Sequence, residues 1–472
     1  MTQANPLPSD ARRPDRGRAR YEVPEEMRSD VRLLGDLLGQ VLSEYPSPGL
    51  LSDVEHLREM VIAAVEDPAG DDLSAAEELV ESFGRERAEE VARAFTCYFL
   101  LSNLAEERHR VRALRAREGT VPVAEQKPSD SIAAALHHLA EEVGEEEARR
   151  RLDGLEFHPV LTAHPTEARR RAISEAVRRI GTLLVERDDP RVGPGAQEEN
   201  RRRLLVEVDT LWRTAQLRSG NPSPIDEVRT AMTVFDASLF DVVPRVYRRM
   251  EDRLAGEQSG LRKPQVPAMV RLGSWIGADR DGNPNVTAKV TREAAGVANQ
   301  HVLAALEKAA RTVAGSLTLT DRFTPPSEGL QALWLRQRRL SEELTEEISG
   351  GCPGESHRRV MAMVAERLAA TQRRDADLAY GDAAELAADL AVVQESLVAA
   401  DAPRAAYGAL QRLVWQVQTY GFHLAELEVR QHSKVHAQTL AWTADPDSVP
   451  EPAVDPQEVL EVFRTMATLQ SR

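Results

Sequence analysis

Residues 268–284 read Ala-Met-Val-Arg-Leu-Gly-Ser-Trp-Ile-Gly-Ala-Asp-Arg-Asp-Gly-Asn-Pro, an apolar run followed directly by a charged loop. The run from Ala268 to Ile276 is short and strand-like rather than helical. The loop from Gly277 to Pro284 adds three charges and an asparagine between glycines and a proline. We therefore expect a short strand whose carboxyl end carries polar side chains.

The same succession occurs at two other places. Phe157-His-Pro-Val-Leu-Thr-Ala163 runs into His164-Pro-Thr-Glu167, and residues 422–430 form a third strand-like run. Mostly helical sequence separates the three runs. In (β/α) barrels the chemistry gathers at the carboxyl ends of the strands. The pattern thus predicts a mostly α-helical chain with a partial (β/α) TIM-like barrel, made of the first three barrel strands with large helical insertions. A closed barrel needs eight strands, so either the sheet closes differently or the chain is incomplete.

Helical periodicity dominates the rest of the chain. Apolar residues recur at spacings of three and four from Val31 to Leu42, and a longer helical segment runs from Leu73 to about Arg117. The first twenty residues are rich in arginine and proline and lack the apolar core of a signal peptide. We expect a disordered tail over 1–20, an N-terminal helical region over 21–150 and the partial barrel over 151–472, with strands near 157–163, 268–276 and 422–430.

Composition excludes several classes of protein. The 472 residues include 60 Lys and Arg against 76 Asp and Glu, a formal net charge of −16, which disfavours non-specific binding to a nucleic acid backbone. Cys97 and Cys352 are the two cysteines, too few and too far apart for a disulfide framework or a Cys-ligated zinc site. The longest apolar stretches fall well short of the about 20 residues that cross a bilayer. We expect a cytoplasmic protein that binds neither nucleic acid nor membrane.

His164 follows the first predicted strand. Pro165 favours an extended backbone at His164 and cannot continue the strand ladder, so the imidazole is held where the chain turns. A histidine held there can transfer protons near neutral pH, and a capping or core histidine is the alternative. Arg169, Arg170 and Arg171 suit phosphate or carboxylate ligands, although an exposed basic face paired with acids explains them as well.

The other two runs also end in charged residues. Arg280, Asp281 and Asn283 lie in the loop after Trp275, and there Arg280 would be free to bind an anionic substrate. The alternative is a solvated turn without a ligand. Taken by itself, a tryptophan at position 275 is more often a core residue than a ligand contact. In the third run Glu426, Glu428 and Arg430 share one face. Charges that face into a barrel are costly unless they are paired or used, which favours a functional role over an exposed strand edge.

Three motifs together resemble the phosphoenolpyruvate carboxylase family. They occur in the family's order: Val160-Leu-Thr-Ala-His-Pro-Thr-Glu167 with Arg170 and Arg171 downstream, Gly273-Ser-Trp-Ile-Gly-Ala-Asp-Arg-Asp-Gly-Asn-Pro-Asn-Val-Thr287, and Leu427-Glu-Val-Arg-Gln431. Segments 99–109 and 211–229 are similar too, so the resemblance runs from about residue 25 to the end of the sequence.

The resemblance implies that phosphoenolpyruvate is carboxylated by bicarbonate to oxaloacetate and phosphate, a reaction that feeds the tricarboxylic acid cycle and needs Mg²⁺. Bicarbonate attacks the phosphoryl group to give carboxyphosphate and the enolate of pyruvate, and the carbon dioxide that then forms meets the enolate. His164 is implied to take the carboxyphosphate proton or to assist its breakdown. Arg430 is implied to hold the phosphoryl or carboxyphosphate oxygens.

The resemblance also implies less specific roles for further residues, and it assigns several catalytic groups to the second half of the family's sequence. It places Arg280, Asp281, Asn283 and Trp275 on the bicarbonate side, and Arg170 and Arg171 in a regulatory anion site at a subunit interface. Members of the family are much longer, and their second half supplies a glycine-rich loop, a catalytic lysine and the acidic Mg²⁺ ligands. We therefore expect a homo-oligomer, a tetramer in the family, or a complementing C-terminal chain. The alternative is a non-catalytic helical regulatory or interaction module derived from that family.

Overall fold

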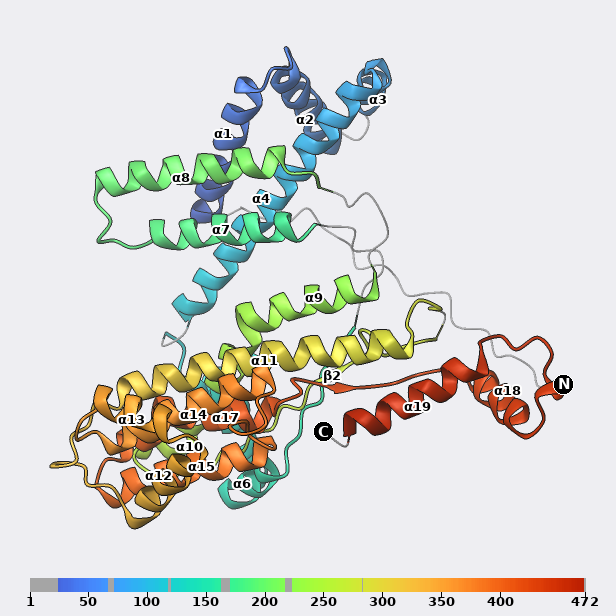
Figure 1. The fold of residues 1–472 in the computed structure, drawn as a ribbon. Coiled ribbons are helices and arrows are strands. Elements are labelled where there is room, and N and C mark those ends of the chain that lie inside the picture. Colours follow the sequence, from blue (N-terminus) through green and yellow to red (C-terminus); the bar gives the residue numbers. More distant parts are fainter. Residues whose placement is uncertain are drawn as a thin grey trace. The chain divides into compact units, whose positions relative to one another are not determined.

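The computed structural model of the chain describes residues 24–66, 72–117, 120–162, 170–216, 223–281 and 283–470 (Figure 1). The chain forms two compact units: unit 1 comprises residues 1–120 and 169–218, and unit 2 comprises residues 121–168 and 219–472. The tail expected over 1–20 lies outside the described residues. The boundary expected near residue 150 falls inside unit 2, and the division into functional domains stays a prediction.

Unit 1 is built from helices. In the part that the structure describes, they are α1 (Glu25–Glu44), α2 (Leu50–Glu66), α3 (Asp72–Ser82), α4 (Arg85–Arg117), α7 (Arg171–Arg187) and α8 (Pro194–Arg213). The apolar periodicity that predicts α1 also gives its buried face, with Leu34, Leu37, Leu38 and Val41 in the core. α1 packs against α4 and α8, so the early helices share one core with a helix pair that comes much later in the chain.

Unit 2 holds the remaining described elements. Its α-helices are α5 (Ile132–Val143), α6 (Glu145–Asp153), α9 (Pro224–Val234), α10 (Phe240–Ala255), α11 (Ala288–Ser316), α12 (Glu328–Leu340), α13 (Glu342–Gly351), α14 (Ser356–Arg373), α15 (Ala383–Ala399), α16 (Pro403–Tyr407), α17 (Ala409–Tyr420), α18 (Ser433–Ala444) and α19 (Pro456–Gln470). Short 3₁₀ turns span Val123–Glu125, Gly256–Gln258 and Pro446–Ser448, and one π-helical turn spans Phe235–Leu239. The long helix α11 packs against α9, α14, α17 and α19 (Figure 1).

The three strand-like runs form one parallel sheet. β1 (Val160–Leu161), β2 (Gly273–Ser274) and β3 (Glu426–Leu427) lie in that order, with β2 in the middle. Isolated bridges from Phe157 to Val270 and from Asp279 to Arg430 extend the pairing beyond the regular strands. The mostly helical architecture is confirmed. The sheet has three strands among the described residues, so a TIM-like barrel is not demonstrated.

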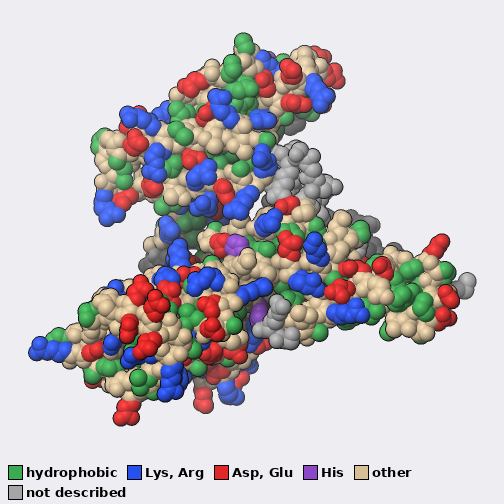
Figure 2. Space-filling view, viewed as in Figure 1, with side chains coloured by type: hydrophobic (Ala, Val, Ile, Leu, Met, Phe, Trp, Pro, Cys, Tyr) green, Lys and Arg blue, Asp and Glu red, His purple; other side chains and the backbone are tan. Residues whose placement is uncertain are grey.

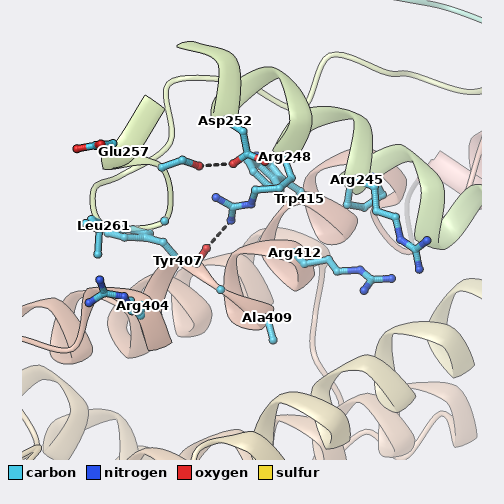
Figure 3. A pocket seen from close by; sticks show the side chains of 14 residues that line it. Arg245, Arg248, Asp252, Glu257, Leu261, Arg404, Tyr407, Ala409, Arg412 and Trp415 are labelled. Atoms are coloured by element: carbon cyan, nitrogen blue, oxygen red, sulfur yellow. Dashed lines mark hydrogen bonds between the residues drawn. The ribbon is translucent and has the colours of Figure 1, made fainter. Parts of the chain in front are cut away.

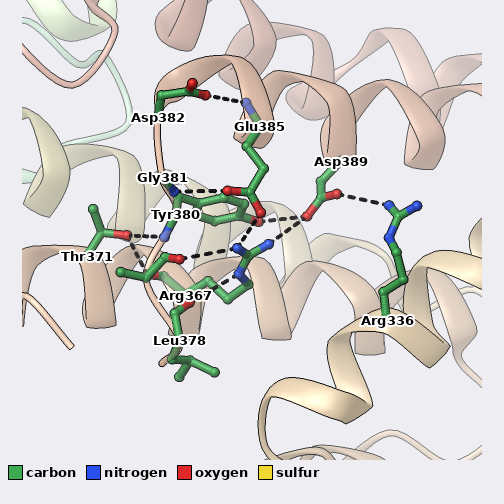
Figure 4. Close-up of polar contacts among 10 residues, drawn as sticks. Arg336, Arg367, Thr371, Leu378, Tyr380, Gly381, Asp382, Glu385 and Asp389 are labelled. Carbon is green, nitrogen blue, oxygen red and sulfur yellow. Dashed lines mark hydrogen bonds and ion pairs between the residues drawn. The ribbon is translucent and has the colours of Figure 1, made fainter. Parts of the chain in front are cut away.

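A buried ionic cluster joins α14 to α15 in unit 2 (Figure 4). The Arg367 guanidinium contacts Asp389 at 3.2 Å and Glu385 at 2.5 Å, and it stacks on the Tyr380 ring at 3.7 Å from the ring centre. Burial raises the pKa of Asp389, and Arg367 partly offsets this effect. Arg367 and Asp389 are both buried, whereas the Glu385 side chain is 46% exposed. Because a lone buried charge is costly, Arg367 and Asp389 stabilise the helix pair only when both are present.

The surface of the molecule mixes charges of both signs (Figure 2), and both cysteines are buried. Acidic and basic side chains are interspersed over the face shown in Figure 2, and apolar side chains gather over α18. Cys97 and Cys352 are both buried free thiols. Among the described helices, none has the length and apolarity needed to cross a membrane.

Candidate functional site

The carboxyl ends of β2 and β3 bring two of the predicted site residues together. The Arg280 backbone N–H donates to the Arg430 carbonyl at 3.0 Å, and the Arg430 N–H donates to the Ala278 carbonyl at 3.3 Å. These bonds continue the parallel ladder past the regular strands, so the loop after Trp275 runs beside the segment that follows β3. Side chains from two distant motifs therefore meet at one edge of the sheet.

Arg430 is held in place and still open to solvent. Its guanidinium carbon lies 4.3 Å from the centre of the Trp275 ring, within the range of a cation–π contact. Its Nη1 lies 3.6 Å from Asp279 Oδ2, and 43% of the side chain is exposed. The ring and the carboxylate restrict the guanidinium, while most of its N–H groups remain able to bind an anion.

Glu428 holds the Trp275 ring. Its Oε2 accepts a hydrogen bond from Trp275 Nε1 at 2.6 Å. A Cβ at Gly273, on the neighbouring strand, would lie 3.0 Å from Glu428 Oε1 and 3.2 Å from Val160 Cγ2, so the glycine leaves room for this carboxylate. Sequence reasoning places Glu428 on the same face as Arg430 but does not identify the tryptophan as its partner. Glu428 therefore fixes the Trp275 ring, and the ring in turn positions the Arg430 guanidinium.

The sequence predicts that Arg280 is free to bind an anion, but its side chain is buried and hydrogen-bonded within the protein. It is 7% exposed, its Nη1 donates to the Ala278 carbonyl at 3.1 Å, and its Nη2 donates to Thr291 Oγ1 at 2.7 Å. Burial lowers its pKa, and Glu458 opposes this shift. Nε is buried without a partner among the described residues. The guanidinium therefore ties the loop to α11, and Nε is its one donor that has been desolvated without compensation.

Asp281 and Asn283 shape the rest of this loop. The Asp281 N–H donates to Asp279 Oδ1 and the Asn285 N–H donates to Asn283 Oδ1, each at 3.1 Å. Arg280, Asp281 and Asn283 line a cavity of about 480 Å³ whose other walls come from α18, α19 and the segment after β3. These walls are mostly apolar, with Glu458, Gln431 and two histidines as polar groups.

The remaining predicted site residues lie elsewhere. His164 and Arg169 are outside the described residues. Arg170 and Arg171 belong to unit 1, where Arg170 precedes α7 and its N–H donates to the Gln216 carbonyl at 3.3 Å. Arg171 Nε donates to Glu175 Oε1 at 2.6 Å. Both arginines are exposed, and their role in a regulatory anion site stays a prediction.

The part of the chain that the structure describes does not fit a complete magnesium site. No three His, Cys, Asp or Glu side chains come together there in a group that could hold a metal ion. Asp279, the acid closest to the candidate catalytic arginine, is already engaged with it. The Mg²⁺ that the resemblance implies therefore has no ligand set among these residues.

The fold and the site define a class: a mostly helical chain with a partly exposed arginine, Arg430, at the carboxyl ends of parallel strands. Comparison with known proteins then identifies the family. The profile described as "Phosphoenolpyruvate carboxylase" matches residues 27–449. The chain is 35% identical over 434 residues to the phosphoenolpyruvate carboxylase of Azoarcus sp. (strain BH72) and 36% identical over 444 residues to that of Roseiflexus castenholzii (strain DSM 13941 / HLO8). The chain belongs to the phosphoenolpyruvate carboxylase family.

The match covers only part of these relatives. It includes 88% and 89% of this chain but 46% of each of the two relatives, and it corresponds to the N-terminal half of the family. The chain thus spans about half the length of the curated relatives that it matches. This confirms the family resemblance and its restriction to one half.

Proposed function

We propose that this chain is the His164- and Arg430-bearing part of a phosphoenolpyruvate carboxylase, a carbon–carbon lyase that converts phosphoenolpyruvate and bicarbonate into oxaloacetate and phosphate. The family membership and the printed names of the relatives support this proposal. In it, β1, β2 and β3 are the first three strands of a TIM-like barrel. His164 transfers the carboxyphosphate proton or assists its breakdown.

The placement of Arg430 is the observation that carries the proposal. Its guanidinium is stacked on Trp275, has one long ion pair with Asp279 and is 43% exposed. A guanidinium with free N–H groups at the carboxyl end of a parallel strand suits the oxygens of a phosphoryl group or of carboxyphosphate. An arginine that served stability alone would use more of its donors within the protein, as Arg367 does.

The neighbouring residues complete the proposed substrate side. Trp275, Arg280, Asp281 and Asn283 shape the region where bicarbonate binds, with Arg280 Nε as a buried donor that still lacks a partner among the described residues. Arg170 and Arg171 form a regulatory anion site. The acidic Mg²⁺ ligands, the glycine-rich loop and the catalytic lysine come from the half of the relatives that this chain does not match. The working form is a cytoplasmic homo-oligomer or a complex with a complementing C-terminal chain, and it feeds the tricarboxylic acid cycle.

Binding of phosphoenolpyruvate tests the role of Arg430, with Arg271 as a matched control. Arg271 lies just before β2, is paired with Glu156 at 3.3 Å and is 52% exposed, so it resembles Arg430 in environment but lies at the amino end of the strand. In this chain combined with the second half of a relative, Arg430→Ala should weaken phosphoenolpyruvate binding about tenfold or more, the loss expected for a charge-assisted contact. Arg271→Ala should leave it within about twofold. Equal effects of the two substitutions would contradict the proposal.

Turnover tests the role of His164. In the same combined enzyme, His164→Asn should reduce oxaloacetate formation by about a hundred- to ten-thousand-fold, the contribution typical of proton transfer, while phosphoenolpyruvate binding changes little. A coupled reductase assay measures the rate. The 472-residue chain alone should show negligible turnover. Absence of turnover also from the combined enzyme, with binding absent too, would favour the non-catalytic regulatory or interaction module.

A further inference from the structure

A second cavity of unit 2 lies between α10 on one side and α16 and α17 on the other. It has a volume of about 600 Å³, within the roughly 300–1,000 Å³ typical of small-molecule sites. We call it the α10–α17 cavity; Figure 3 shows its lining residues. None of them lines the cavity beside Arg280 or contacts Trp275 or Arg430. The α10–α17 cavity is therefore separate from the candidate carboxylation site.

Arginines dominate the polar lining of this cavity. Arg245 and Arg248 come from α10, Arg404 from α16 and Arg412 from α17, against the acids Asp252 and Glu257. Asp252 accepts a hydrogen bond from the Ser259 hydroxyl at 2.5 Å. The lining carries four guanidinium groups and two carboxylates, which leaves an excess of positive charge in a chain whose net charge is −16.

Among the described residues, three of these arginines have no carboxylate partner. Arg412 forms an ion pair with Asp241 on α10. In the described part of the chain, neither Arg245 nor Arg404 forms an ion pair. Arg248 donates to the Tyr407 carbonyl and lies 4.9 Å from the centre of the Trp415 ring, again without an acid. Like charges gathered around one cavity repel each other, so their arrangement favours an anionic occupant.

The positions of the arginines indicate the shape of that occupant. In Figure 3, Arg245 and Arg412 extend toward one end of the cavity, Arg404 lies near Leu261 at the other end, and Arg248 points into the space between them. Positive groups at both ends suit a molecule with two separated anionic groups. Guanidinium groups bind carboxylate and phosphate oxygens by the same paired hydrogen bonds, so this geometry serves both chemistries.

We propose that the α10–α17 cavity binds a small metabolite that carries two anionic groups. Arg404 holds one group, Arg245 and Arg412 hold the other, and Arg248 lies along the middle of the ligand. Trp415, 2% exposed and stacked by Arg248, forms the floor of the cavity. This proposal does not depend on the carboxylase function, because the cavity shares no residue with that site.

Calorimetric titration of the full chain tests the proposal with two probes, pyrophosphate for the phosphate arm and citrate for the carboxylate arm. We expect saturable binding of at least one probe. The probe that binds shows whether the natural ligand carries phosphate or carboxylate groups. Acetate, with a single charge, should bind at least about tenfold more weakly than that probe, because it engages only one end of the cavity. Arg404→Gln and Arg248→Gln should each weaken binding about tenfold.

Arg253→Gln provides the matched control. Arg253 is exposed on α10 but does not line the cavity, and its substitution should change the affinity by less than about twofold. Arg404 is exposed, so its substitution leaves the packing intact, which an unchanged thermal midpoint verifies. The proposal is overturned if neither probe binds saturably, if acetate binds as well as pyrophosphate and citrate, or if Arg253→Gln weakens binding as much as Arg404→Gln.

Discussion

Gly277 offers a direct test of how the loop after β2 is packed. Its φ is +78°, and a Cβ built there would lie 2.7 Å from Ala294 Cβ on α11 and 3.1 Å from Val228 Cγ2 on α9. Gly277→Ala therefore imposes two costs, an unfavourable backbone conformation and a clash with a packed helix. Gly260 isolates the first cost, because its φ is +72° and a Cβ there would meet nothing within 4 Å.

The two costs differ in size. An alanine at positive φ is destabilised by about 1–2 kcal/mol, and this applies to both positions. Overpacking adds about 1–3 kcal/mol at Gly277 alone. We expect Gly277→Ala to lower the free energy of unfolding of unit 2 by about 2–5 kcal/mol and Gly260→Ala by about 1–2 kcal/mol. The difference between them measures the contact with Ala294.

Urea unfolding of each variant, followed by tryptophan fluorescence, gives the change in unfolding free energy. A double-mutant cycle with Ala294→Gly should recover part of the clash, although glycine inside α11 itself costs about 1 kcal/mol. Equal destabilisation by Gly277→Ala and Gly260→Ala, within about 0.5 kcal/mol, would show that the loop does not pack on α11 as described.

Three further results are expected. Glu428→Ala should remove the acceptor of Trp275 Nε1 and weaken phosphoenolpyruvate binding several-fold in the combined enzyme, whereas Glu426→Ala, on the same face of β3, should not; equal effects would refute the positioning role. Burial lowers the pKa of His357, with Asp321 opposing, so the unfolded chain binds a proton that the folded chain does not, and stability should fall as the pH drops below about 6.5. Denaturant midpoints measured against pH should show this slope, and His357→Gln should flatten it; an unchanged slope would contradict the assignment. Burial raises the pKa of Cys97 to about 11, so a thiol reagent should label Cys97 in the folded chain far more slowly than in denaturant; comparable rates would refute its burial.

The strand positions are predictable from sequence because short apolar runs that end in charged loops have few other structures open to them. The regular pairing covers only two residues in each run, from Val160, Gly273 and Glu426. Pro159 lacks an N–H, which removes one donor from the ladder just before β1. The bridges at Phe157 and Arg430 show that the runs nevertheless lie side by side over most of the expected length.

The contacts between distant motifs are not predictable in this way. The period-two pattern predicts that Glu428 and Arg430 lie on the same face of the strand, but it does not identify Trp275 as the partner of both side chains. Arg280 is read as a free guanidinium because its loop is polar, and its burial depends on Thr291 in a helix that the loop pattern does not reveal. Likewise, the apolar stripes of α7 and α8 predict helices but not that they complete the core begun by α1 and α4.

The order of the sheet also has a consequence for how the chain is made. β1 pairs with β2 and β2 pairs with β3, and in both pairs the second strand is synthesised more than a hundred residues later, so β1 has no partner when it leaves the ribosome. At a synthesis rate of about 5–20 residues per second, β1 stays unpaired for roughly 5–20 s until β2 is made, and β2 stays unpaired still longer until β3 is made. The helices between them form from local contacts in far less time. Arg430, which follows β3, is therefore placed late in folding, and the still unpaired β1 and β2 are the segments on which chaperones should act during translation.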